Sequence, residues 1–81
     1  MKTTMISTIN RLSKAFEDSK GYRPNLLYVN SIQLNLLKKQ FREPNIDIIS
    51  QLIGMEIIIV DSAEEAYVSW AQINWKHRSI A

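Results

Sequence analysis

The sequence predicts an α+β domain in which two main helices and one short helix pack on a small sheet of about four strands. Three observations support this fold class. Apolar residues recur at helical spacing near the N-terminus, two short apolar runs have the composition of strands, and glycine or proline stands at the breaks between these segments. With 81 residues, 46% hydrophobic and 22% charged, the chain has the length and composition of one globular domain over residues 1–81.

The first predicted element is a helix over residues 3–19. Its apolar residues recur at spacings of three and four, which places them on one face. They are Met5, Ile9, Leu12 and Phe16. Thr3 or Thr4 can cap the start of this helix, and Gly21 can adopt the left-handed conformation that follows a helix end.

A strand and a second helix follow. Residues 26–29 form a short apolar run that is typical of a strand buried on both faces, and Pro24 favours an extended chain before it. Asn30 or Ser31 can cap a helix over residues 31–41, with Gln33 in the position of a capping box. The predicted buried stripe of this helix is Ile32, Leu36, Leu37 and Phe41. Pro44 is expected to stop the helix.

A third, short helix is predicted over residues 46–53, with Asn45 as its cap and Gly54 just beyond its end. Its apolar residues are Ile46, Ile49, Leu52 and Ile53. The segment "MEIIIVD", residues 55–61, is rich in β-branched residues and is the clearest strand of the chain.

Two patterns compete in the C-terminal segment. Asp61 or Ser62 followed by Glu65 resembles a helix cap and favours a helix over residues 62–76. Apolar residues that alternate with polar ones, many of them β-branched or aromatic, favour one strand near residues 65–70 and another near residues 72–78. We prefer the two strands.

The sequence offers no recognisable catalytic or cofactor motif. Cysteine is absent, which excludes disulfides and thiolate metal sites, and His77 is the one histidine. The acidic residues Asp61, Glu64 and Glu65 could do acid–base chemistry or bind a cation, but their spacing favours a polar turn after a strand. We therefore predict a protein that is not an enzyme and that has no cofactor or metal site.

The chain also lacks the apolar segments that membrane insertion requires. No apolar run approaches the roughly 18 residues that span a bilayer, and the first residues lack the apolar core of a signal peptide. We expect a cytoplasmic location and no membrane partner.

Two basic clusters raise the alternative of a small nucleic-acid-binding module, since the net charge is +2. The residues that would contact phosphates are Lys38, Lys39, Arg42, Lys76 and Arg78. Aromatic residues beside the second cluster could stack on bases. The competing interpretation is that the first cluster complements the dipole at a helix C-terminus, and that the aromatic residues belong to the core or to a protein interface.

Three segments in a fixed order, "RPNLLYVNSIQLNLLKKQF", "LIGMEIIIVDS" and "EEAYVSW", resemble the later portion of tailed-phage major capsid proteins, whose fold encapsulins share. The matching positions are Pro24, Asn30, Leu36 or Leu37, Leu52, Gly54, Ile57, Tyr67 and Val68. Met55 and Glu56 stand where that family has a proline shortly after the glycine. The chain has room only for the compact axial-type domain of that family.

The resemblance implies a phage-related protein that packs against neighbours, has no active site in this region and is virion-associated. It gives Tyr67, Trp70 and Trp75 a use as interface residues, because tyrosine and tryptophan are enriched at interface cores. A strand near the C-terminus could then pair edge to edge with a second copy. We therefore expect a structural or interaction domain that forms homo-oligomers or packs on another protein.

Overall fold

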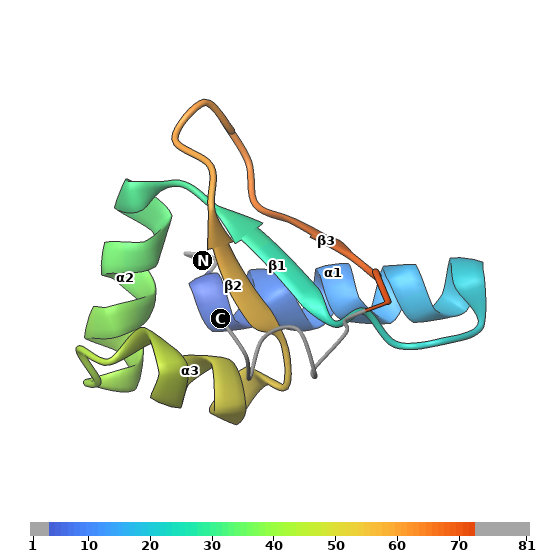
Figure 1. The fold of residues 1–81 in the computed structure, drawn as a ribbon, viewed down its shortest axis with the longest axis horizontal. Helices are drawn as coiled ribbons and strands as arrows, with labels where there is room; N and C mark the ends of the chain where they lie inside the picture. The colour runs from blue at the N-terminus through green and yellow to red at the C-terminus, as the bar shows by residue number, and fades with distance from the viewer. Residues whose placement is uncertain (1–3, 73–81) are drawn as a thin grey trace.

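The α+β fold class is confirmed by the computed structural model, which describes residues 4–72 (Figure 1). The chain forms three helices and three strands in the order α1 (Met5–Lys20), β1 (Leu26–Val29), α2 (Ser31–Phe41), α3 (Ile46–Ile53), β2 (Glu56–Ile59) and β3 (Tyr67–Ser69). Within residues 4–72, none of the helices combines the length and the apolarity that crossing a bilayer requires.

The sheet is mixed, and β1 is its central strand. The strand order is β2-β1-β3, with β2 parallel and β3 antiparallel to β1. Leu27 lies opposite Ile57 on one side and opposite Val68 on the other. The clearest strand of the sequence, β2, therefore lies beside the central strand β1. Within residues 4–72, no strand other than β1 pairs with β2.

The helices pack on one face of this sheet. Leu27 and Val29 of β1 are fully buried in a cluster whose other buried members are Met5, Ile9, Leu34, Leu37 and Met55. In Figure 1, α1 crosses behind the sheet while α2 and α3 lie to its left. Side chains alternate along a strand, so Tyr28 points to the opposite face from Leu27 and Val29.

The predicted helix starts and two of the predicted ends are confirmed. Thr4 caps α1, and Asn30 forms a complete capping box with Gln33 at the start of α2. Asn45 caps α3. Gly21 and Gly54 end α1 and α3 in the left-handed conformation, with φ of 83° and 74°. These caps satisfy backbone groups that a helix end leaves unpaired.

The predicted buried stripe of α2 is wrong in part. Ile32 is 73% exposed and Leu36 is 42% exposed, whereas Leu34 and Leu37 are buried. Residues 34, 37 and 41 are also spaced by three and four, so a helical period fits either set, and the position of the sheet decides which set is buried. The same holds in α3, where Ile49 is fully buried but Leu52 is 62% exposed.

Of the helix and strand patterns in the C-terminal segment, the strand pattern is confirmed for the first half. Residues 67–69 form β3 rather than part of a helix, within the strand predicted near residues 65–70. The fourth predicted strand, near residues 72–78, falls outside the described residues except for Gln72, which lies in no strand.

Candidate functional site

The sheet face opposite the helices carries two stacked tyrosines. Tyr28 and Tyr67 are direct neighbours in the antiparallel ladder, and their rings stack with centroids 4.5 Å apart and planes 12° apart. Ile58 lies opposite Tyr28 on the parallel side. Tyr67 is 46% exposed. We call these three residues, Tyr28, Ile58 and Tyr67, the open face.

A second aromatic group lies where β3 ends. Trp70 meets Tyr22 edge to face, and Tyr22 meets Phe16 of α1 in the same way, with both pairs of centroids 5.7 Å apart. This chain of rings holds the end of β3 against the C-terminal part of α1, because edge-to-face aromatic pairs add to the free energy of area burial. Trp70 nevertheless stays 48% exposed.

Asn25 attaches the segment after β3 to the start of β1. Its side-chain amide donates to the carbonyl of Ala71 at 2.8 Å, and its side-chain oxygen accepts from the backbone N–H of Ala71 at 3.0 Å. Its backbone N–H donates to the carbonyl of Ser69, and its carbonyl accepts from the N–H of Glu56. Asn25 thus extends the three-stranded sheet one residue beyond the start of β1.

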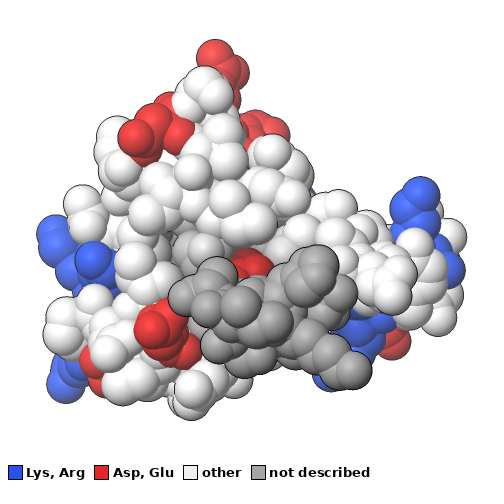
Figure 2. Space-filling view, in the orientation of Figure 1, with Lys and Arg blue, Asp and Glu red and all other residues white. Residues whose placement is uncertain are grey.

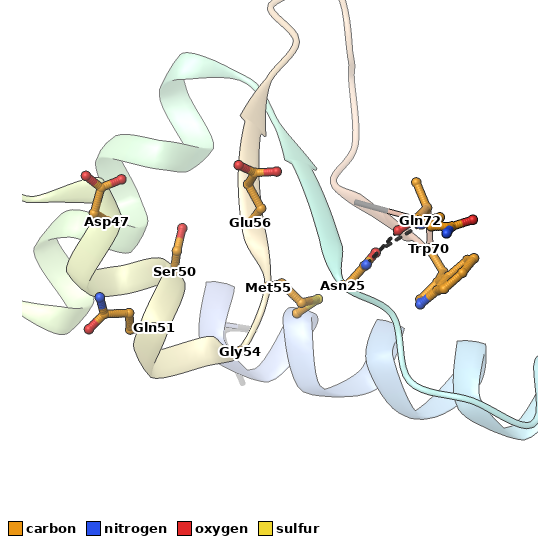
Figure 3. Close-up of a pocket in the computed structure, with 10 residues that line it drawn as sticks. Asn25, Asp47, Ser50, Gln51, Gly54, Met55, Glu56, Trp70 and Gln72 are labelled. Atoms are coloured by element: carbon orange, nitrogen blue, oxygen red, sulfur yellow. Dashed lines mark hydrogen bonds between the residues drawn. The ribbon is translucent and has the colours of Figure 1, made fainter. Parts of the chain in front are cut away.

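A cleft of about 800 Å³ opens beside Asn25, between α3 and the segment that follows β3 (Figure 3). In Figure 3, Asp47, Ser50 and Gln51 line it from α3, Glu56 lies between on β2, and Trp70 and Gln72 line the other side. The lining mixes carboxylate and amide side chains with apolar ones such as Met55 and Trp70. In residues 4–72 no three histidine, cysteine, aspartate or glutamate residues gather to hold a metal ion.

The acidic residues singled out in the sequence lie at the other end of the sheet. The Asp61 carboxylate accepts from the backbone N–H and the hydroxyl of Ser31, which joins the end of β2 to the start of α2. The Asn30 amide donates to the carbonyl of Ala63 at 2.9 Å. Glu64 and Glu65 are exposed. Asp61 therefore has a structural role in the turn that follows β2.

The first basic cluster lies at the opposite end of α2 from these acids. Lys38 and Lys39 stand in the last turn, and Arg42 follows the helix end. Figure 2 shows blue side chains on the left, over α2, and red side chains at the top, over the loop between β2 and β3. The one salt bridge among residues 4–72 is that of Arg23 with Glu17, so this cluster forms no salt bridge with a described carboxylate.

The two predicted interface residues that the structure describes, Tyr67 and Trp70, contact different aromatic partners. Tyr67 stacks on Tyr28, while Trp70 contacts Tyr22. The remaining predicted site residues, Trp75, Lys76 and Arg78, lie outside the described residues together with His77.

Sequence reasoning missed four residues that shape this region: Tyr28, Ile58, Asn25 and Tyr22. The alternation of side chains along residues 26–29 could have placed Tyr28 opposite to Leu27 and Val29. No sequence signal distinguishes Asn25 from other loop asparagines, because its partner Ala71 is reached only through the fold.

These features define a small α+β domain with a mixed sheet, one face of which carries partly exposed aromatic side chains. The sequence matches no family model, and neither the curated proteins nor the solved structures contain a match to it.

Proposed function

We propose that this chain is a non-enzymatic interaction domain that works by self-association through protein–protein packing. The observation that carries the proposal is the open face, where a stacked tyrosine pair is presented on the sheet with Tyr67 46% exposed. Tyrosine gives a large contact area at little cost in side-chain entropy, and it is enriched among the residues that dominate binding.

The balance of buried and exposed apolar side chains supports the same proposal. Nine hydrophobic residues are buried in residues 4–72, and eight large ones are exposed there. Single exposed apolar residues are ordinary on a protein surface. This number of exposed apolar residues beside so small a core favours a surface that binds a partner. The order of motifs that resembles phage capsid proteins adds a phage-related origin to the proposal.

Tyr67→Thr tests the role of the open face. Threonine keeps strand propensity but removes the ring, so we expect the dissociation constant of the self-associated form to rise at least about tenfold. The measurement is light scattering after size-exclusion chromatography at about 100 µM, above the micromolar constants of weak interfaces. Circular dichroism checks that the variant is folded.

Ile32→Thr is the matched control, since Ile32 is 73% exposed but lies on α2. It should leave association unchanged. A wild-type chain that stays monomeric at this concentration, or a Tyr67→Thr variant that associates like the wild type, would contradict the proposal.

The second candidate function is nucleic-acid binding, supported by the cluster of Lys38, Lys39 and Arg42, which forms no salt bridge within residues 4–72. Fluorescence anisotropy with labelled single- and double-stranded DNA tests it. Binding through phosphates should weaken steeply between about 50 and 200 mM salt, and it should weaken further when the three cations are changed to glutamine. Affinity that does not depend on salt would remove this candidate.

A further inference from the structure

The cleft beside Asn25 has an acidic lining. Asp47 of α3 and Glu56 of β2 contribute carboxylates to it, and no lysine or arginine of the described part of the chain lines it. In Figure 3 both carboxylates lie on one side of Asn25, and Gln72 lies on the other. Met55 adds an apolar side chain to the lining. The cleft therefore fits an occupant that combines cations with apolar side chains.

This cleft adjoins one end of the sheet face that carries Tyr28. Leu26 lies on the same face, since it is two residues from Tyr28 along β1, and its neighbours in the two ladders are Glu56 and Ser69. Leu26 is 6% exposed, yet it is not a member of the buried cluster between the sheet and the helices. The face is thus open at Tyr67 but covered at Leu26, at the end where the cleft begins.

The chain enters the cleft at a fixed point. The side chain of Asn25 holds the backbone of Ala71 by two hydrogen bonds of 2.8 and 3.0 Å, and the next residue, Gln72, lines the cleft. The sequence INWKHRSIA follows Gln72 and contains two cations, one tryptophan and two isoleucines. This segment therefore starts at the cleft and has a composition that complements the lining.

We propose that residues 73–81 of this chain bind in the cleft. The cations of the segment, Lys76 and Arg78, then lie beside the two carboxylates, and Trp75 lies over the apolar part of the lining. Opposite charges favour this placement, and an indole offers a large apolar contact area. The inference goes beyond the proposed self-association and does not depend on it. It also turns two cations that could contact phosphates toward carboxylates of the same chain.

The segment can cross the cleft from its own attachment point. A volume of about 800 Å³ corresponds to a width on the order of 9 Å, and the four residues from Gln72 to Lys76 span about 13 Å when extended. Tethering gives the segment an effective concentration on the order of 1 mM. A free peptide that bound with a Kd of about 0.1 mM would then be docked about ten times more often than undocked when tethered. A second copy at micromolar concentration competes poorly with this, so we assign the cleft to the segment of the same chain.

Acrylamide quenching of Trp75 fluorescence tests the docking in the whole chain. Trp70→Phe leaves Trp75 as the one tryptophan and keeps an aromatic ring beside Tyr22. A docked indole is shielded from the quencher. We therefore expect the quenching constant of the native variant to be at least about threefold lower than that of the same variant unfolded in urea. Equal constants, with circular dichroism showing a folded variant, would overturn the proposal.

Two double variants with the same change in net charge assign the site. Asp47→Asn with Glu56→Gln removes both carboxylates of the cleft, whereas Glu64→Gln with Glu65→Gln removes two exposed carboxylates at the other end of the sheet. In the Trp70→Phe background, the first pair should raise the quenching constant about threefold, because a partly exposed ion pair changes an equilibrium by up to about fivefold. The second pair should leave it unchanged. Equal effects of the two pairs in folded variants would remove the cleft as the site.

Dilution identifies the copy that supplies the segment. Shielding of Trp75 by its own chain should be the same at about 1 µM and about 100 µM protein, because tethering fixes the local concentration. Shielding that is lost on dilution would assign the cleft to the segment of a second copy and would overturn docking within one chain. A protein that stays monomeric with a shielded Trp75 would contradict the proposed self-association but support this inference.

Discussion

At the scale of single residues, Arg42 is the one described residue other than glycine with a positive φ, at 55°. It ends α2 in the left-handed conformation, and its N–H donates to carbonyls in the last turn of the helix. The sequence led us to expect that Pro44 stops this helix. The helix instead ends before Arg42, at a position where a side chain with a Cβ is strained.

We predict that Arg42→Gly stabilises the fold. Glycine relieves the left-handed strain but increases the entropy of the unfolded chain, so the expected net gain is about 0.5 kcal/mol, or a rise in Tm of about 2–4 °C. Thermal unfolding followed by circular dichroism measures this change.

Two variants control for this interpretation. Arg42→Ala removes the cation but keeps the Cβ, so it should give no gain. Gly54→Ala makes the opposite change at φ 74°, where an added Cβ would meet nothing within 4 Å, and it should cost about 1 kcal/mol through backbone strain alone. An equal gain from Arg42→Ala would assign the effect to charge.

At the scale of elements, the strands have only three or four residues, and side-chain amides hold both ends of the central one. Asn25 binds the backbone of Ala71 beyond β3, and Asn30 binds the backbone of Ala63 before it. These contacts hold β3 to β1 on both sides of the residues that pair in the antiparallel ladder. Such short strands are expected to depend on them.

We predict that Asn25→Ala weakens the attachment of β3. Two hydrogen bonds are lost, which should lower the free energy of unfolding by about 1–3 kcal/mol. Urea denaturation measures the loss. Asn35→Ala is the control, because Asn35 is exposed on α2 and makes no side-chain hydrogen bond, so its change should be neutral or slightly stabilising. Equal stability of the two variants would contradict a role for Asn25.

The sequence predicted where helices and strands lie along the chain better than it predicted which of them lie side by side in the fold. Thr4, Asn30 and Gly54 mark helix ends through local hydrogen bonds and backbone conformation, which the sequence encodes within a few residues. Strand order depends on contacts between distant segments. Nothing in "EIIIV" indicates that it lies beside the central strand at one edge of the sheet that residues 4–72 form.

At the scale of the whole molecule, the fold decides how far each predicted interface residue is exposed. Tyr67 and Trp70 were predicted as interface residues because tyrosine and tryptophan are enriched at interface cores, and both are partly exposed. Their partners, Tyr28 and Tyr22, could not be assigned because each pair joins segments about 40 or more positions apart (67 − 28 and 70 − 22). Long-range pairing of this kind follows from topology rather than from local pattern.

The central position of β1 has a consequence for the order in which the chain folds. Leu26 pairs with Glu56 and with Ser69, which lie 30 and 43 positions further along (56 − 26 and 69 − 26). Neither ladder can form as a local hairpin, so each requires the closure of a long loop before any contact is gained. The helices can begin to form within their own segments, whereas the sheet must wait until the chain through Ser69 is available. Folding should therefore be slower than that of a helical domain of the same length.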